Sequence, residues 1–503
     1  MKKSKKELFM LILLLSVVLT AAADDGIRMS GCRRGVVLPP KNARRSLTDS
    51  RHVGGDFYHG NRRQMVVLAS FRDRPFQDDE ATTIAKWDKI FNTENFDEGS
   101  FVGSIHDYFL AQSYGQFNLS FDFYFVNLPD SVYKYKSTAT DDENSQYMVD
   151  DIVDILQKED IDWSLYDWNG DGYVNQLLIL YAGKGMNNGG GDNSIWPHQW
   201  WLSMHLDQTV TDKEVNRNYR TVTSEGKQYI IDCYCCLQEM SNSASSTTFG
   251  TICHEYSHCF GFPDFYNNRA EYVGKWDLMD YGNMNGNGYC PPNYSSHERW
   301  LMGWCTPVEL TSDTTVTGMA ALCDEPQAYL IRNDGYANEY YMIENRQKRG
   351  WDLHLPGSGL VIFHVDFNES LWVSIYEYVN TGALRHYSII PADNKFSLLF
   401  NNGSGWGYPY QGNDSLTNYS VPAATLNNAN TDGSKLMNKS LTNMNVTDGL
   451  ASFTFTNDDG AVSAIQSATV DSQQPMEVLY RIGSINIIRN ARGEIFKVFT
   501  KSQ

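Results

Sequence analysis

The chain has 503 residues, more than one ordinary domain, and 42% of them are hydrophobic, which is enough to form buried cores. Lys and Arg number 41 against 60 Asp and Glu, so the formal net charge is −19. An acidic surface of this strength repels phosphate groups, which argues against nucleic acids and anionic membranes as partners.

The first residues predict export. Residues 1–23 contain four lysines, then an apolar run, then small residues, which is the order of a secretory signal peptide. A retained N-terminal anchor is the alternative interpretation. No later stretch reaches about 18 uninterrupted apolar residues, so we expect no integral membrane span after signal removal. The expected location is therefore outside the cell.

Residues 24–63 are basic in an otherwise acidic chain and show little periodicity, which predicts an extended arm. We interpret it as a flexible leader or linker, or as a propeptide that is cut near Arg44 and Arg45 when a zymogen is activated. In a narrower version of the second interpretation, the Cys32 thiolate is a removable ligand of a metal in the active site.

Residues 64–305 alternate between strand and helix patterns, which predicts an α/β layer. A further strand, Tyr229–Leu237, is expected to line a cleft, where an extended peptide can pair with its edge. The other predicted strands are 65–71, 117–126 and 176–181, and the predicted helices are 80–91, 104–113, 144–158, 247–260 and 294–304.

The stretch Asp167–Asn175 follows the first part of a calcium-binding loop. Oxygen-bearing side chains occupy positions one, three, five and nine, and Gly172 occupies position six. Leu178 stands where the bidentate Glu of a complete loop belongs, so an Asp/Gly-rich turn is the alternative. The predicted Ca²⁺ ligands are Asp167, Asn169, Asp171, Tyr173 and Asn175.

The sequence His254-Glu255-x-x-His258 predicts a zinc site. Positions i and i+4 share one face of a helix, so both imidazoles can bind one ion. Gly261 can end the helix in a left-handed conformation and let the chain bring Asp264 under the metal as third ligand. A water in the remaining position would be acidified by the zinc, and Glu255 would take its proton as general base.

Chance is the alternative for this motif. The bare pentad arises in roughly one chain in a hundred of this length, and adding the Gly and Asp lowers that to well below roughly one in a thousand. A buried helix face would also be unlikely to carry these charged groups without a metal, because unpaired buried charge is unfavourable.

The helix, Gly261, the Asp264 ligand and the following Tyr266 resemble the immune inhibitor A family of secreted bacterial metallopeptidases, within the metzincin group. This resemblance implies a catalytic domain with a twisted mixed sheet and helices over the zinc helix. It also implies that Met279 forms the Met-turn beneath the metal. Tyr281 stands where related enzymes carry a tyrosine that touches the zinc or the tetrahedral intermediate. Asp264 departs from the commonest pattern, which has a third His.

After residue 305 the chain changes to short β runs between Gly, Asn and Asp turns. Residues 306–457, called the β-rich region below, are predicted to form an all-β, sandwich-like domain. Residues 458–503 are predicted to be a linker and a tail with two β runs around a turn. The tail resembles C-terminal tails of secreted Bacteroidetes proteins, which implies cell-surface attachment; a plain terminal hairpin is the alternative.

Two further sites are weaker candidates. His198 lies among tryptophans and is either a transition-state donor or a packing residue. His364 and Asp366 share one face of a predicted strand and are either a site or a hydrogen-bonded pair in the core.

Taken together, these patterns predict an α+β fold and a secreted zinc endopeptidase that acts on polypeptides, with calcium as a second cofactor. Two alternatives remain open. The first is a non-peptidase zinc hydrolase that acts on another amide. The second is a surface binding protein that works through the β-rich region.

Overall fold

The computed structural model describes residues 58–137, 144–204, 219–266, 272–372, 379–380, 384–395 and 403–458, and the backbone of three strands between 477 and 499. The predicted signal peptide and residues 24–57 of the basic arm lie outside this part. Within it, no helix is both long enough and apolar enough to cross a membrane.

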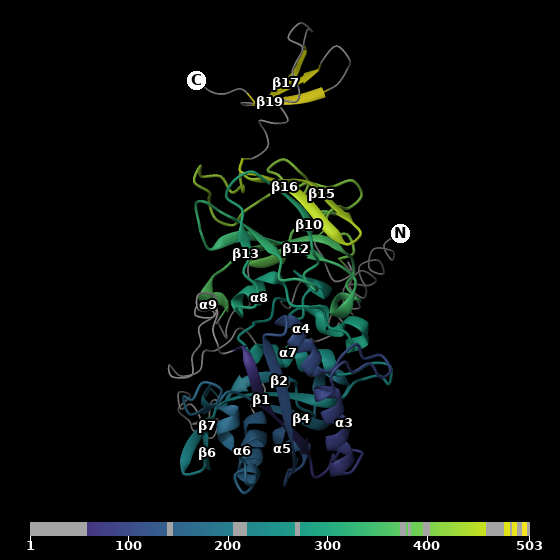
Figure 1. Cartoon of the computed structure of the whole chain (residues 1–503), viewed down its shortest axis with the longest axis vertical. Helices are drawn as coiled ribbons and strands as arrows, with labels where there is room; N and C mark the ends of the chain where they lie inside the picture. Colours follow the sequence, from purple (N-terminus) through teal and green to yellow (C-terminus); the bar gives the residue numbers. More distant parts are fainter. Residues whose placement is uncertain are drawn as a thin grey trace, which may run out of the picture.

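The chain alternates helices and strands, mostly strands after residue 305 (Figure 1). The α-helices are α3 (Glu80–Asn92), α4 (Ile105–Gln112), α5 (Val132–Tyr135), α6 (Ser145–Leu156), α7 (Phe249–Cys259), α8 (Ser296–Leu301) and α9 (Glu369–Trp372). The 3-10 helices are η2 (Trp163–Tyr166), η3 (Met186–Asn188), η4 (Leu202–Met204), η5 (Gly274–Trp276), η6 (Tyr281–Gly288) and η7 (Gly350–Asp352). The strands are β1 (Gly60–Ser70), β2 (Phe117–Asn127), β3 (Tyr173–Val174), β4 (Leu177–Lys184), β5 (His198–Trp201), β6 (Arg220–Ser224), β7 (Lys227–Ile231), β8 (Cys233–Met240), β9 (Val308–Glu309), β10 (Thr314–Met319), β11 (Ala328–Arg332), β12 (Glu339–Arg346), β13 (Gly359–Asp366), β14 (Tyr387–Ile389), β15 (Ser440–Thr447), β16 (Leu450–Thr456), β17 (Glu477–Ile482), β18 (Ile485–Arg489) and β19 (Ile495–Phe499).

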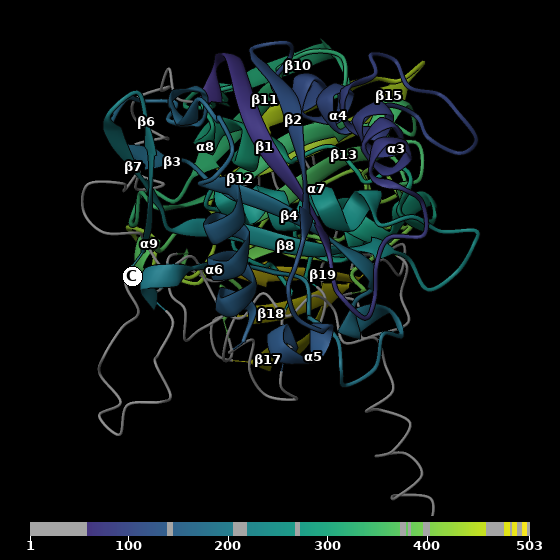
Figure 2. The same cartoon turned by 90° about the horizontal axis from the view of Figure 1, so that it is seen from below.

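The N-terminal half is built on a mixed sheet of five strands in the order β2-β1-β4-β8-β5. Neighbouring strands are parallel except β5, which runs antiparallel to β8. The last seven residues of β1 are all buried, as expected for a central strand that is covered on both faces. Helices α3 and α4 pack against β2, and α7 packs against β8 (Figure 2). The mixed sheet with helices confirms the predicted α+β class.

The single strand expected at Tyr229–Leu237 is a wrong prediction. The chain forms two strands there, because Asp232 leaves the ladder and accepts hydrogen bonds from the backbone N–H and hydroxyl of Ser203, at 2.8 Å each. The second of these strands, β8, lies inside the sheet between β4 and β5. One edge of the sheet is therefore β5, whose short run His198–Trp201 follows a proline and gave no clear strand signal; the other edge is β2.

The β-rich region contains one sheet in the order β14-β13-β12-β11-β9 and a second in the order β10-β16-β15. Every residue of β12 and β13 is buried. Alternation along β12 explains this, because Tyr341 and Ile343 enter a core shared with the second sheet, whereas Tyr340 and Met342 enter the core of the N-terminal half.

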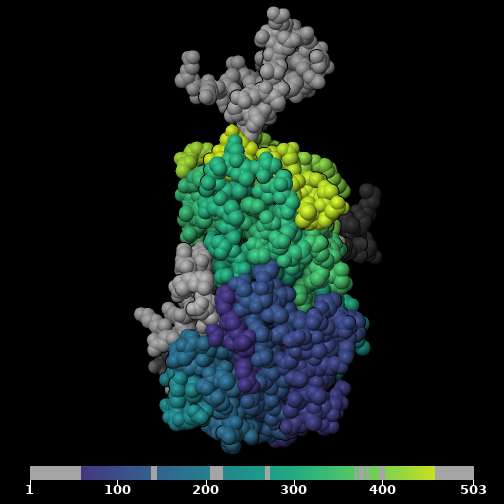
Figure 3. Space-filling model, in the orientation of Figure 1, coloured from purple at the N-terminus to yellow at the C-terminus, as the bar shows by residue number. Residues whose placement is uncertain are grey.

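One hydrophobic core thus runs across the predicted boundary at residues 305 and 306. Val66 of β1, Tyr256 of α7 and Phe363 of β13 belong to the same cluster. In Figure 3 the green surface of the β-rich region lies directly on the blue surface of the N-terminal half. The boundary itself stays a prediction. For the tail the sequence predicts two β runs, whereas the structure has three antiparallel strands in the order β17-β18-β19.

Candidate metal centre

Helix α7 and the turn after it bring the three predicted ligands together. His254 and His258 lie one helical turn apart, with ring centroids separated by 4.8 Å. The helix ends at Cys259, and Gly261 has a φ of 97°, the left-handed conformation that glycine adopts without strain. The chain then reverses and places Asp264 beside both histidines. One ligand atom from each of the three residues lies within 4.8 Å of the others.

Both imidazoles are oriented through their second ring nitrogen. His254 Nδ1 lies 2.8 Å from the Leu278 carbonyl oxygen, and His258 Nδ1 lies 2.6 Å from the Phe262 carbonyl oxygen. A carbonyl only accepts, so each Nδ1 carries its hydrogen and each Nε2 is available as a ligand. Hydrogen bonds of this kind hold metal-binding histidines in a fixed tautomer and ring orientation.

The Nε2 atoms converge on Asp264. Oδ1 of Asp264 lies 3.1 Å from Nε2 of His254 and 3.5 Å from Nε2 of His258, and all three side chains are buried. Nε2 of His258 and Oδ1 of Asp264 are buried without a hydrogen bond in the described part of the chain. Buried polar atoms without a hydrogen bond are rare, and a cation between them would satisfy both. Two imidazoles and a carboxylate fit zinc, which takes three protein ligands in catalytic sites.

The two histidines differ in pKa. Burial lowers the pKa of His254, but the 3.1 Å contact with Asp264 and the charge of Glu255 outweigh burial and raise it to about 9. Burial lowers the pKa of His258 to about 4, against the attraction of Asp264 and together with the repulsion of His254.

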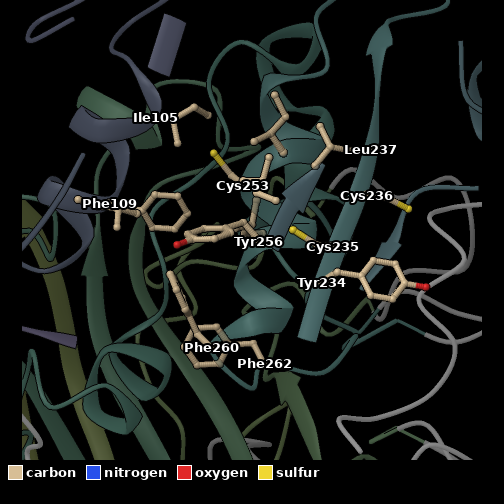
Figure 4. Packing of buried hydrophobic residues seen from close by; sticks show 14 of the residues in the cluster. Ile105, Phe109, Tyr234, Cys235, Cys236, Leu237, Cys253, Tyr256, Phe260 and Phe262 are labelled. Carbon is tan, nitrogen blue, oxygen red and sulfur yellow. The ribbon is translucent and has the colours of Figure 1, made fainter. Parts of the chain in front are cut away.

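Glu255 lies on the same helix turn, directly after His254, and is fully buried. Cys253 and Tyr256 of α7, and Phe260 directly after the helix, point into the hydrophobic core (Figure 4). The Tyr256 hydroxyl donates to Gln64 Oε1 at 2.8 Å, which ties the helix to the start of the buried part of β1. Nothing in the sequence indicated this polar contact.

Met279 and Tyr281 follow in the predicted Met-turn. Met279 is fully buried, and its carbonyl oxygen accepts a hydrogen bond of 2.9 Å from the Phe265 backbone N–H. Tyr281 begins η6 and is half-buried, with its ring centroid 6.2 Å from that of Tyr266. The turn therefore lies against the segment that carries Asp264. The role expected for Tyr281 stays a prediction.

The predicted calcium loop is closed by its own hydrogen bonds. Asp167 accepts from the backbone N–H groups of Asp171 and Gly172 at 3.0 Å each, and Lys227 Nζ lies 3.4 Å from its Oδ2. Asn175 Oδ1 accepts from the Trp168 backbone N–H at 2.7 Å. Across the described segments, the only His/Cys/Asp/Glu group that could hold a metal is the one at Asp264. Calcium binding by this loop stays a prediction.

The weaker candidates lie in separate polar contacts. His198 is buried, with Nδ1 2.7 Å from the Trp196 carbonyl oxygen and Nε2 3.0 Å from Ser145 Oγ, as expected for a packing residue. His364 and Asp366 do not pair with each other. His364 Nε2 lies 2.7 Å from Glu339 Oε1, and Asp366 Oδ2 lies 3.0 Å from Nδ1 of His386.

Comparison with known proteins confirms the resemblance of the N-terminal half to the immune inhibitor A family. Residues 65–302 match the family model of the immune inhibitor A peptidase M6 catalytic domain. Immune inhibitor A of Bacillus thuringiensis subsp. alesti is 28% identical over 167 residues, which cover 30% of this chain and 22% of that protein. The pre-pro-metalloprotease PrtV of Vibrio cholerae serotype O1 (strain M66-2) is 24% identical over 273 residues, which cover 46% of this chain and 28% of that protein. The chain thus spans less than a third of each of these relatives.

Proposed function

Because residues 65–302 carry a catalytic domain of the immune inhibitor A peptidase M6 family, we propose that this chain is a zinc-dependent endopeptidase that hydrolyses polypeptides. The observation that supports it most is the convergence of His254, His258 and Asp264, whose ligand atoms lie within 4.8 Å of one another. The family is one of metallopeptidases, and the chemistry of these three donors suits zinc.

In this proposal, Glu255 and Tyr281 have separate roles in hydrolysis. Zinc, when bound, would act as a Lewis acid and lower the pKa of a water in the site. The Glu255 carboxylate would accept the proton of that water and later donate it to the leaving amine. Its burial places the transfer in a medium of low dielectric, where charges interact strongly. The Tyr281 hydroxyl would donate a hydrogen bond to the oxyanion.

The edge strand β5 is the proposed place for the substrate backbone. In the described segments β5 pairs on one side only, with β8, and it lies near α7. An extended peptide can add to such an edge through main-chain hydrogen bonds, which suits a peptidase because these bonds do not depend on side chains.

The remaining assignments are finer proposals. They are a metzincin-type cleft, secretion directed by residues 1–23, activation by cleavage in residues 24–63, and surface attachment through residues 458–503. Calcium at Asp167–Asn175 would have a stabilising role. A Ca²⁺-dependent rise in Tm that Asp171→Asn removes would support it, whereas a Tm that does not respond to Ca²⁺ would reject it.

Hydrolysis of casein by the purified chain tests the main proposal, before and after limited trypsin cleavage, with 1,10-phenanthroline and zinc re-addition as controls. We expect cleavage that the chelator abolishes and zinc restores, and a higher rate after trypsin if residues 24–63 inhibit. One equivalent of zinc without casein cleavage in either state would contradict the endopeptidase and favour the non-peptidase amide hydrolase. Equal cleavage with and without metal would contradict both.

A further inference from the structure

The loops beside the metal centre are held by the β-rich region. Phe265, which follows Asp264, packs against Tyr387 of β14, with ring centroids 4.0 Å apart and planes inclined by 31°. Asn380 connects the same two residues: its Nδ2 lies 2.8 Å from the Phe265 carbonyl oxygen and 2.7 Å from the Tyr387 carbonyl oxygen. The segment that carries the third ligand is therefore fastened to the β-rich region by a ring contact and a bridging amide.

The same tyrosine reaches the Met-turn. The Tyr387 hydroxyl lies 3.2 Å from Asp277 Oδ2, and the other carboxylate oxygen of Asp277 accepts from the Met279 backbone N–H at 2.8 Å. Between these residues lies Leu278, whose carbonyl oxygen orients His254 through the 2.8 Å contact to Nδ1. A chain of contacts thus runs from β14 through Asp277 to the first histidine.

Packing alone does not account for this position of Tyr387. The Tyr387 hydroxyl lies within hydrogen-bond distance of Asp277 Oδ2 at 3.2 Å as well as Ser295 Oγ at 2.7 Å, one acceptor more than a buried tyrosine hydroxyl needs. Tyr341 of β12 is equally buried, and its hydroxyl has the Thr425 carbonyl oxygen at 2.6 Å, in the second core of the β-rich region. Tyr387 differs because its ring and its hydroxyl contact the two loops that position Asp264 and His254.

We propose that Tyr387, together with Asn380, is a positioning residue of the metal centre, so that the β-rich region is a structural part of the site. This inference rests on the proposed function in one respect, that the metal is zinc. Residues outside the ligands commonly set the affinity of a metal site, because they fix the direction of the ligand atoms.

Zinc affinity of the full-length chain tests this proposal. Tyr387→Phe keeps the ring that packs on Phe265 and removes only the hydroxyl. We expect its zinc affinity, measured by competition with a chelating dye, to fall about tenfold, within the range usual for outer-shell changes. We also expect a shift in the visible absorption of the Co²⁺-substituted protein, which reports on ligand geometry. Asn380→Ala should weaken zinc binding in the same direction.

The matched control is Tyr341→Phe, which removes a hydroxyl from an equally buried tyrosine of the same region. It should bind zinc as the wild type does, with an unchanged Co²⁺ spectrum. Circular dichroism of each metal-free protein establishes that the variants are folded. Equal zinc affinity and equal Co²⁺ spectra for wild type and Tyr387→Phe would overturn the proposal.

Failure of the proposed function has a different signature. A wild type that binds one zinc but cleaves no casein would contradict the peptidase, while the comparison of affinities would still decide the role of Tyr387. A wild type that binds no zinc would overturn both proposals.

Discussion

A backbone carbonyl orients each histidine of the candidate centre. Both carbonyls belong to loops outside α7. Leu278 orients His254, and Phe262 orients His258. The motif spacing predicted that both rings share a face of α7, and it predicted the place of Asp264 after the Gly261 turn. The spacing could not identify Leu278, Asp277 or Tyr387. Any residue type can offer a backbone carbonyl, and Tyr387 of β14 lies 110 residues beyond Asp277.

Asp264 should dominate zinc affinity at the level of single residues. We expect Asp264→Asn to weaken zinc binding by more than about 100-fold, because it removes a charged ligand and outer-shell changes alone reach about 10–100-fold. The control is Asp232→Asn, a buried carboxylate that accepts hydrogen bonds from Ser203 away from the ligands. Similar zinc affinities for the two variants in a chelator competition would exclude Asp264 as a ligand.

Tyr281 should act on turnover and leave metal binding unchanged. Tyr281→Phe is expected to lower kcat about 100-fold, as does the loss of one oxyanion donor in other hydrolases, with zinc content intact. Tyr266→Phe is the control, because its ring lies beside that of Tyr281. Steady-state casein kinetics compare the two; an unchanged kcat for Tyr281→Phe would remove this residue from the mechanism.

At the scale of elements, helix ends and paired strands were predictable to different degrees. The N-terminal ends of α3 and α4 lie at the N-cap residues Asp79 and Ser104, whose side chains accept hydrogen bonds from backbone N–H groups of the first turn. The break between β7 and β8 was not predictable, because an unbroken apolar run surrounds Asp232 and the partner that removes it from the ladder is distant in sequence.

The turn after α7 requires glycine. Gly261→Ala places a side chain at a φ of 97°, so we expect a loss of about 1–3 kcal/mol in the free energy of unfolding and weaker zinc binding as Asp264 shifts. Gly412, with a φ of 86° and open space around it, provides the control Gly412→Ala. That variant should lose stability but bind zinc with the wild-type affinity. Zinc titration and urea unfolding separate the two effects, and unchanged zinc affinity in Gly261→Ala would contradict the role given to this turn.

The His386–Asp366 pair should stabilise the β-rich region over a limited pH range. Burial opposes ionisation of both groups, but their contact raises the pKa of His386 above its usual 6.5 and lowers that of Asp366 below its usual 3.8. A raised His pKa gives stability that is full below pH 6.5 and is lost as pH rises through the raised value; a lowered Asp pKa gives stability above pH 3.8 that is lost on acidification.

The difference in unfolding free energy between wild type and His386→Gln should therefore be largest between about pH 4 and 6.5 and shrink above it. Urea unfolding at a series of pH values measures this difference. His354→Gln, which removes an imidazole at an exposed position, is the control. A His386→Gln difference that grows from pH 6 to 9 would contradict the sign argued here.

At the scale of the whole molecule, the N-terminal half and the β-rich region share a core. The sequence predicted that the chain changes to β structure after residue 305, because the periodicity changes there. It did not predict that one face of β12 and β13 contributes to the core of the N-terminal half, since the residues of a strand that is buried on both faces do not reveal which neighbour covers which face.

A shared core predicts cooperative unfolding. Thermal unfolding followed by far-UV circular dichroism and by loss of casein hydrolysis should give one transition at the same temperature, because the larger hydrophobic core contains residues of both halves. Trp351, which stacks on Phe249 of α7 at 5.7 Å, belongs to this contact, and Trp351→Ala should lower both transitions together. Two transitions in which activity is lost well before the β signal would contradict a single cooperative unit.

The central claim is that Glu255 works on a zinc ion held by His254, His258 and Asp264. Zinc content and casein turnover, measured on the same preparations of wild type and Glu255→Ala, test it most directly. We expect one equivalent of zinc in both proteins and a turnover at least about 100-fold lower in the variant, since a general base contributes 10²–10⁴-fold. Turnover by Glu255→Ala at the wild-type rate with its zinc in place would contradict the account.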